Sequence, residues 1–306
     1  MRKHAAKTGA KIPAGGAASA ILRERQGILT DKSDFFIREA YKTLRTNLYF
    51  ATADVEGCRV IMVTSAIQSE GKSITALNLA ISLSDAGNRV LLIDCDLRRP
   101  KLARLVNIAD KNGLSDLLVH PQMQETVIHT YRHTLDVLLA GHMPPNPSEL
   151  LGSARMANLL KVLKERYDYI LLDTSPVNVV TDACVLTPQV SGTVFVVRAG
   201  QSERGAVRYA LNQLNYVHAK VYGFVLNGTS AEKAPYGKKY YGRYGLRYGF
   251  RYGFRYGYGY GSRYSNQYDY GYGAVDKKAS SIDREAYRAV VRPDEEAWQE
   301  ETDRKP

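Results

Sequence analysis

Cysteine is scarce in this 306-residue chain, and its three residues, Cys58, Cys95 and Cys184, show no paired spacing. An odd number of scattered cysteines, with no secretory signal before them, argues against a disulfide framework and predicts a reducing, cytoplasmic environment. The six histidines are equally scattered, so a structural zinc site is not expected.

Long apolar runs are absent as well. No stretch approaches the roughly 18 to 20 apolar residues that a membrane-spanning helix requires. Residues 1–27 are basic and rich in Ala and Gly, and they lack the continuous apolar segment of a secretory signal. We therefore expect any membrane association to depend on a partner or on surface charge.

Acidic residues are missing from one region. Between Lys233 and Arg263 there are eight basic residues and no acidic one, so most of the net charge of +11 belongs to this segment. A basic protein ordinarily suggests binding to nucleic acid or to an anionic membrane. Because the excess is local, that inference is weak, and nucleic acid is not the expected partner.

Composition divides the chain into four parts. Residues 34–229 hold enough apolar material for a sizeable core and are predicted to fold as one domain. Residues 1–33 are expected to form a basic, flexible arm, and residues 274–306 a charged extension without a predicted role. Residues 230–273 contain the repeat RYGL-RYGF-RYGF-RYGY, whose glycines disfavour both a helix and a packed core. We expect this segment to be a disordered, tyrosine-rich tail.

The central region alternates helical and strand patterns. Apolar residues at Ile37, Tyr41, Leu44 and Leu48 predict an amphipathic helix over residues 36–50. The alternation favours an α/β fold with a mainly parallel sheet flanked by helices on both faces. Ligands of such sheets bind at the carboxyl ends of the strands. The other predicted elements are strands over residues 59–64, 90–93, 135–139, 169–172, 194–197 and 223–226, and helices over residues 73–84, 153–165 and 206–216.

The residues after the first predicted strand fit the phosphate-binding loop of P-loop NTPases. The loop reads AIQSEGKS, with Ala66 where the first glycine usually stands. In such a loop, backbone N–H groups and a helix N-terminus bind phosphate, Lys72 reaches the terminal phosphates, and the Ser73 hydroxyl contacts Mg²⁺. A GKS triplet alone is common by chance, but its place between a strand and a helix favours a nucleotide site. The expected nucleotide-binding residues are Ala66, Ile67, Gln68, Ser69, Glu70, Gly71, Lys72, Ser73 and Ile74.

Three carboxylates follow predicted strands. Asp94 and Asp96 lie in LLIDCDLRRP, and period-two geometry should point both to one side. Neighbouring carboxylates repel each other unless a cation or a shared proton lies between them, and Mg²⁺ on a phosphate would supply that cation. Asp173 follows YILL and fits a Walker B role of holding Mg²⁺. The alternatives are solvated acids in a turn for the first two and a helix N-cap for Asp173.

Together these segments resemble bacterial tyrosine kinases of the capsular and exopolysaccharide type. LLIDCDLRRP is similar to that family's Walker A′ motif and YDYILLDTSP to its Walker B motif, and EAYKTLRTNL and AGHMPPNPSELL are also similar to family segments. The resemblance covers about residues 28–227 and implies ATP and Mg²⁺ as cofactors. It leaves open which A′ aspartate accepts the hydroxyl proton. By match, the catalytic residues are Lys72, Asp94, Asp96 and Asp173, the metal contacts are Ser73, Asp94 and Asp173, and Asn227 lies near the adenine.

The resemblance also implies self-assembly. Glu39, Lys42 and Arg45 match an E-x-x-R-x-x-R motif through which family members close a ring. Lys42 departs from this motif, and an ammonium cannot reproduce the bidentate contact of a guanidinium. The alternative for these three residues is an ordinary solvated helix face.

Other implications concern partners and further departures. Family members work with a transmembrane adaptor of the polysaccharide co-polymerase type and a cognate phosphotyrosine phosphatase, which would hold this chain at the inner face of the plasma membrane. Gln68-Ser69 stands where the family often has Pro-Gly, and Ser175 stands where it has the first of two prolines. These departures bear on activity.

The tail offers the expected phosphate acceptors. Thirteen of the 22 tyrosines lie between Tyr236 and Tyr272. A flexible, glycine-spaced chain would let successive rings enter one site, including a site on a neighbouring subunit. Each phosphate adds about −1.5 to −2 charges, which would reverse the charge of the tail and repel adjacent subunits. The expected acceptors are Tyr244, Tyr248, Tyr252, Tyr256, Tyr258, Tyr260, Tyr264, Tyr268, Tyr270 and Tyr272.

Two alternative functions fit parts of the sequence. An ATPase switch of the MinD/ParA kind shares the loop and the parallel sheet, but those proteins carry an additional lysine early in the loop, where this chain has Ile67. A polyanion-binding protein would use the alternating Arg and Tyr residues of the tail for phosphate contacts and stacking. The leading hypothesis is a tyrosine kinase that phosphorylates itself.

Overall fold

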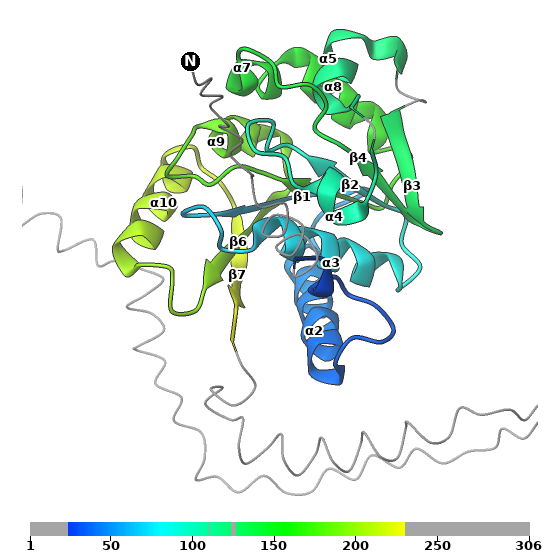
Figure 1. The fold of residues 1–306 in the computed structure, drawn as a ribbon. Coiled ribbons are helices and arrows are strands. Elements are labelled where there is room, and N and C mark those ends of the chain that lie inside the picture. The colour runs from blue at the N-terminus through cyan, green and yellow to red at the C-terminus, as the bar shows by residue number, and fades with distance from the viewer. Residues whose placement is uncertain (1–23, 110, 124–126, 230–306) are drawn as a thin grey trace, which may run out of the picture. The chain divides into compact units, whose positions relative to one another are not determined.

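A seven-stranded sheet forms the centre of the fold, with helices on both faces (Figure 1). The computed structural model describes residues 24–109, 111–123 and 127–229, so the predicted tail, the C-terminal extension and most of the predicted N-terminal arm lie outside the described residues. The strand order is β3-β4-β2-β5-β1-β6-β7. All neighbours are parallel except β3 and β4. The strands are β1 (Arg59–Ser65), β2 (Val90–Asp94), β3 (Ile128–Arg132), β4 (Leu135–Leu138), β5 (Tyr169–Asp173), β6 (Gly192–Arg198) and β7 (Val221–Asn227).

The central strands are apolar on both faces because helices cover both. Val60 and Met62 of β1 belong to one core cluster, whereas Ile61 and Val63 belong to the other. Successive side chains of a strand point to opposite faces, so an unbroken apolar run supplies two cores. The predicted α/β fold with a mainly parallel sheet is confirmed.

The helices divide between the two core clusters. On one face lie α2 (Phe35–Ala51), α3 (Lys72–Ser84) and α4 (Leu102–Val106). On the other lie α5 (Leu114–Val119), α7 (Pro147–Leu151), α8 (Ala154–Leu163), α9 (Asp182–Leu186) and α10 (Arg204–Tyr216). The predicted helices correspond to α2, α3, α8 and α10. The other helices have only five or six residues, too few for a helical period to be visible in the sequence.

Strand β3 was not predicted from the sequence. Its residues, IHTYR, are half-buried or exposed and form no apolar run. It lies at the edge of the sheet and pairs antiparallel with β4, which follows it after a short connection. An edge strand has fewer buried positions than a central one, so its pattern is weak.

The end of the predicted N-terminal arm packs on the fold. Leu29 is buried, its backbone N–H donates to Asn78 Oδ1 at 2.7 Å, and Asn78 Nδ2 donates to the Gly27 carbonyl at 2.8 Å. Arg132 also donates to the Leu29 carbonyl at 2.8 Å. Gly27 and Leu29, which the sequence analysis placed in the flexible arm, therefore pack against the domain. The attachment uses polar side chains 49 to 103 residues away, which no local pattern reports.

The carboxyl ends of the parallel strands meet at one edge of the sheet. The phosphate-binding loop follows β1, Asp94 ends β2, Asp173 ends β5 and Asn227 ends β7. These residues are far apart in the sequence, and the parallel topology brings them to one edge, where ligands of such sheets bind.

Candidate active site

The phosphate-binding loop turns sharply into α3 at Gly71. Gly71 has a φ of +94°, in the left-handed region, and precedes the first helical residue, Lys72. A Cβ at this position would lie 1.9 Å from Asn227 Nδ2. That amide donates to the Glu70 carbonyl at 2.9 Å, so the end of β7 is fastened against the loop. Only glycine satisfies both the conformation and the close approach.

Glu70 stabilises the loop from within. Its side chain is fully buried, and its carboxylate accepts hydrogen bonds from the Ile67 N–H at 2.8 Å and from the Ser202 hydroxyl. Gln201 donates to the Gln68 carbonyl at 3.4 Å, which adds a second link to the segment after β6. Of the residues predicted to bind nucleotide, Glu70 thus uses its side chain to shape the loop and has only its backbone to offer a phosphate.

A cavity of about 760 Å³ opens beside the loop. Its wall includes hydrophobic residues of α2 and β7, among them Tyr41, Leu44 and Val225. This volume is within the usual range for small-molecule sites, which combine apolar walls with a few polar groups. The predicted nucleotide-binding residues that line it are Ser69, Gly71, Lys72, Ser73, Ile74 and Asn227.

Asp94 and Asp173 stand side by side on neighbouring strands. They are register partners in the pairing of β2 with β5, and both are fully buried. Burial raises the pKa of both carboxyl groups, and the charge of Asp173 raises that of Asp94 further. The Asp94 carboxylate accepts hydrogen bonds from the backbone N–H groups of Asp96, Lys101 and Leu102, with N···O distances of 3.0 to 3.2 Å. It therefore also fixes the turn that leads into α4.

Asp173 has the features of a cation ligand. Neither of its carboxylate oxygens has a hydrogen-bond donor of good geometry among the described residues. The Lys72 ammonium and the Ser73 hydroxyl are near enough to counteract part of the rise in its pKa. A buried carboxylate whose oxygens lack a well-aligned donor in this part of the chain, beside a second carboxylate and a serine hydroxyl, offers the hard oxygen ligands that Mg²⁺ prefers. These residues fit the predicted metal contacts of Ser73, Asp94 and Asp173.

Asp96 has partners different from those of Asp94. Strand β2 ends at Asp94, so the period-two argument that placed both carboxylates on one side does not extend to Asp96. Asp96 lies in the turn beyond the strand, where its carboxylate is 3.3 Å from Lys72 Nζ and accepts the Ser175 hydroxyl at 2.8 Å. Both side chains of the Lys72–Asp96 pair are more than nine-tenths buried.

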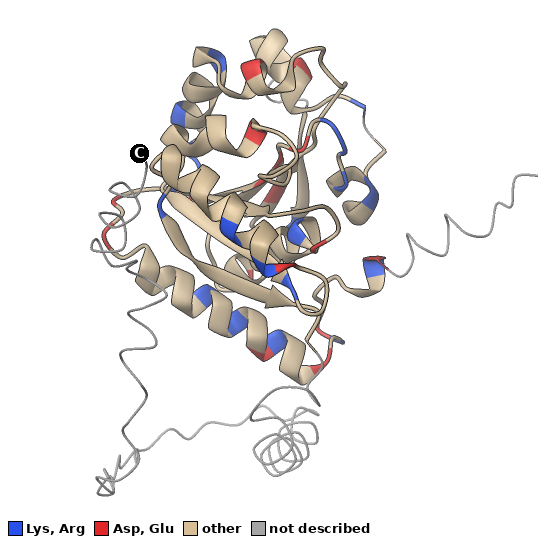
Figure 2. Ribbon diagram, turned by 90° about the vertical axis from the view of Figure 1, so that its left-hand side faces the viewer, with Lys and Arg blue, Asp and Glu red and all other residues tan. Residues whose placement is uncertain are grey.

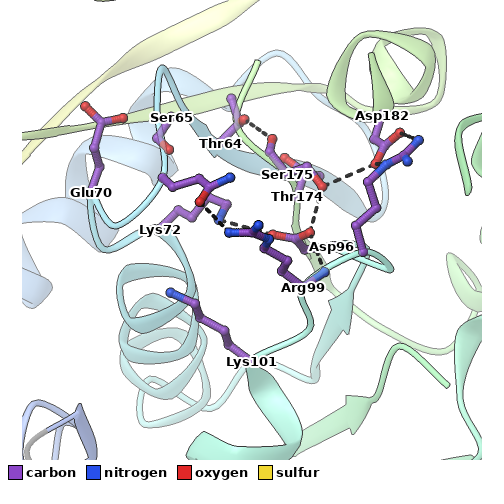
Figure 3. Close-up of polar contacts among 12 residues, drawn as sticks. Thr64, Ser65, Glu70, Lys72, Asp96, Arg99, Lys101, Thr174, Ser175 and Asp182 are labelled. Carbon is purple, nitrogen blue, oxygen red and sulfur yellow. Dashed lines mark hydrogen bonds and ion pairs between the residues drawn. The ribbon is translucent and has the colours of Figure 1, made fainter. Parts of the chain in front are cut away.

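A polar cluster next to this pair was missed by sequence reasoning (Figure 3). Asp182 is fully buried and forms an ion pair with Arg98 at 3.0 Å. Its carboxylate also accepts the Ser148 hydroxyl at 2.5 Å and lies 3.2 Å from the Ser175 hydroxyl. The cluster thus joins α7, α9, the turn after β2 and the turn after β5. Asp182 lies 7 residues from Ser175, but 34 residues from Ser148 and 84 from Arg98, so no single stretch of the sequence contains the cluster.

The predicted ring-forming residues lie along α2, where Lys and Arg recur and Glu39 is the one acidic residue (Figure 2). Lys42 forms an ion pair with Glu39 at 2.7 Å within the helix. Arg45 donates to the Ser82 carbonyl of α3 at 2.6 Å. In the single chain, these side chains are therefore engaged with their own subunit.

No helix in the described ranges has both the length and the apolar character to cross a membrane. In the same part of the chain, His, Cys, Asp and Glu side chains form no group of three or more arranged to hold a metal ion. A cation at the candidate site would take its remaining ligands from phosphate and water, as Mg²⁺ in nucleotide sites does.

Comparisons with known proteins agree with this geometry. Residues 58–206 match the family model described as an AAA domain. The chain is 35% identical to the putative tyrosine-protein kinase CapB of Staphylococcus aureus over 216 residues, which cover 70% of this chain and 93% of CapB. It is 38% identical to the tyrosine-protein kinase YwqD of Bacillus subtilis over 206 residues, 67% of this chain and 86% of YwqD. Among solved structures, the kinase domain of the Escherichia coli tyrosine kinase ETK is 34% identical, with a TM-score of 0.60 over 63% of this chain and 76% of that chain. The chain therefore belongs to the bacterial tyrosine-protein kinases.

Proposed function

We propose that this tyrosine kinase transfers the γ-phosphate of ATP to tyrosines of its own C-terminal tail, from one subunit to the next. The observation that carries the proposal is the junction of the phosphate-binding loop with Asp94, Asp96 and Asp173 at the carboxyl edge of the sheet. A loop alone would support only nucleotide binding. Carboxylates beside Lys72 and Ser73 add a metal site and a proton acceptor, the groups that phosphoryl transfer requires.

The loop and α3 would bind the phosphates. Gly71, Lys72 and Ser73 at the helix N-terminus line the cavity, and the aligned peptide dipoles favour negative charge there. Lys72 would contact the terminal phosphates, and the apolar wall formed with α2 and β7 would accommodate the base, with Asn227 close by. These assignments use six of the nucleotide-binding residues predicted from the sequence.

The carboxylates would serve two roles, metal binding and proton acceptance. Ser73 and Asp173 would hold Mg²⁺, with Asp94 beside them, and the ion would neutralise charge that develops on the transferred group. Either Asp94 or Asp96 would accept the proton of the tyrosine hydroxyl, whose unperturbed pKa near 10 makes a positioned base necessary. Asn replacements at each position distinguish the two: loss of the base lowers the maximal transfer rate, and loss of a metal ligand raises the Mg²⁺ requirement.

The tail would supply the acceptors, and the biological setting follows from the family. The tyrosine cluster from Tyr244 to Tyr272 lies outside the described residues, so its role rests on its sequence. A transmembrane adaptor would hold the kinase under the membrane, a phosphatase would reverse the modification, and the phosphorylated tail would control capsular or exopolysaccharide synthesis. Binding to the adaptor and loss of polymer in a kinase-dead strain would support this setting.

The test is a phosphosite map of the purified full-length chain after incubation with Mg-ATP. We expect several phosphotyrosines between residues 236 and 272 by mass spectrometry. Lys72→Met should remove them, because the lost ammonium would no longer bind the terminal phosphates.

The absence of phosphotyrosine from the wild-type chain, with and without a candidate adaptor, would overturn the proposal. ATP hydrolysis without phosphate on the tail would favour the ATPase switch instead. Steeply salt-dependent polynucleotide binding that survives Lys72→Met would favour a polyanion-binding role.

A further inference from the structure

Ser175 occupies an unusual position between two buried carboxylates. It lies in the turn after β5 and is only 2% exposed. It stands where bacterial tyrosine kinases have the first of two prolines. Its hydroxyl is 2.8 Å from Asp96 Oδ1 and 3.2 Å from Asp182 Oδ2 (Figure 3). Proline has no hydrogen-bond donor at all, so this contact is a feature of the present chain.

One hydroxyl carries one proton, so it can donate to only one of the two carboxylates. Asp182 already accepts three other hydrogen bonds: two from Arg98, at 3.0 and 3.3 Å, and one from the Ser148 hydroxyl at 2.5 Å. Asp96 has fewer donors: Lys72 at 3.3 Å and the Arg99 backbone N–H at 3.2 Å. The shorter distance to Asp96 and the smaller number of other donors around it both favour donation of the Ser175 proton to Asp96.

The contact becomes more important when nucleotide binds. In the proposed function Lys72 contacts the terminal phosphates, so its ammonium is drawn from Asp96 or shared with the phosphates. Where the ammonium is drawn away, the donors that remain to Asp96 within the described ranges are the Arg99 N–H and the Ser175 hydroxyl, in a site that is 5% exposed. A buried carboxylate with few donors is poorly held and can move out of position.

We propose that Ser175 is a positioning residue that holds the Asp96 carboxylate in place while Lys72 is engaged with phosphate. The Asp182–Arg98–Ser148 group occupies the other side of the hydroxyl and directs its proton toward Asp96. This inference rests on the proposed kinase function and extends it with a residue outside the phosphate-binding loop and the three aspartates.

Ser175→Ala in the full-length chain tests the assignment. The initial rate of phosphotyrosine formation at saturating Mg-ATP should fall about 10-fold to 100-fold, the loss expected when a charged group loses one hydrogen bond. The ATP concentration for half-maximal rate should change less than about 2-fold, because the side chain of Ser175 contacts Asp96 and Asp182, which are not among the predicted nucleotide-binding residues. The melting temperature without nucleotide should stay close to that of the control, since Lys72 still pairs with Asp96.

Thr174→Val is the matched control. It removes a buried hydroxyl one residue away, whose hydrogen bond goes to the Val63 carbonyl at 3.1 Å and not to Asp96. A purely structural role predicts equal rates for the two variants, and that result would overturn the inference. So would a loss that appears in the half-saturating ATP concentration instead of the maximal rate. A wild-type chain without transfer would overturn the proposed function itself, whereas an active wild type with an equally active Ser175→Ala would overturn only this inference.

Discussion

At the scale of single residues, the site depends on atoms that approach one another closely. Gly71 brings the loop backbone against the Asn227 amide, and Glu70 ties the loop to the segment after β6. Asp94 and Asp173 are held side by side in a buried environment that raises the pKa of both. Such a pair is costly to the empty protein, and a bound cation would relieve the cost.

Gly71→Ala should reduce both stability and nucleotide binding. An alanine would pay the steric cost of positive φ, about 1 to 2 kcal/mol, and its Cβ would displace the Asn227 amide from the Glu70 carbonyl. Loss of that hydrogen bond adds about 1 kcal/mol. Urea unfolding and calorimetric titration with Mg-ATP measure the two effects.

Gly57→Ala is the control for this prediction. Gly57 also has positive φ, at +70°, but nothing lies within 4 Å of a Cβ there. The Gly57→Ala variant should lose only the stability that the steric cost of positive φ removes, and it should bind nucleotide like the wild type. Equal losses for the two variants would contradict the role given to the contact with Asn227.

At the scale of elements, the turns after β2 and β5 are joined by buried charges. The turn after β2 supplies Arg98, and α9 supplies Asp182, whose side chain is fully buried. Ser148 of α7 completes the group, which gives the AGHMPPNPSELL segment a structural role. Through Ser175 the group reaches Asp96, which pairs with Lys72 of the cavity wall, so packing outside the cavity bears on a residue that lines it.

Arg98→Ala should destabilise the fold by about 3 kcal/mol, because it leaves a buried carboxylate without its cation. Arg99→Ala is the control, because it removes a side chain of the same size and charge at the next position. Arg99 is exposed, and its side chain donates to Gln68 Oε1 at 2.7 Å, a contact whose loss should cost at most about 1 kcal/mol. Chemical denaturation of both variants measures the difference, and similar free energies would show that the Asp182 pair contributes little.

At the scale of the whole molecule, the catalytic groups and the proposed acceptors belong to different parts of the chain. The site lies within residues 24–229, and the tyrosine cluster begins at Tyr236. Transfer between subunits follows if the ring expected from Glu39, Lys42 and Arg45 brings one tail to the site of the next subunit. In the single chain, Arg45 is bound to the Ser82 carbonyl, so assembly would have to replace that contact.

Transfer between subunits predicts that an inactive chain becomes phosphorylated in a mixture. Lys72→Met chain labelled with ¹⁵N, incubated with unlabelled wild type and Mg-ATP, should carry phosphotyrosine in its heavy tail peptides. Mass spectrometry separates the two populations. Phosphate confined to the light peptides would show that each tail is modified by its own subunit.

The sequence by itself determined the fold class, the central strands and the identity of the chemical groups. Apolar runs with helices between them specify a parallel sheet, and the phosphate-binding loop and the aspartates are short patterns set by local geometry. The edge strand β3 and the short helices escaped prediction because half-buried or very short elements have little periodicity. Residues 24–33 escaped because two apolar residues, Ile28 and Leu29, form no periodic pattern, and the polar side chains that also attach this segment lie far along the chain.

Only the tertiary structure decided how these groups are used. In the folded chain Asp94 accepts hydrogen bonds from the turn before α4, and Asp173 has no well-aligned donor among the described residues. Glu70 stabilises the loop, and Ser175 lies between Asp96 and Asp182. These contacts join residues as much as 79 positions apart. A hydrogen bond depends on distance and direction in space, and a local sequence pattern carries neither until the chain has folded.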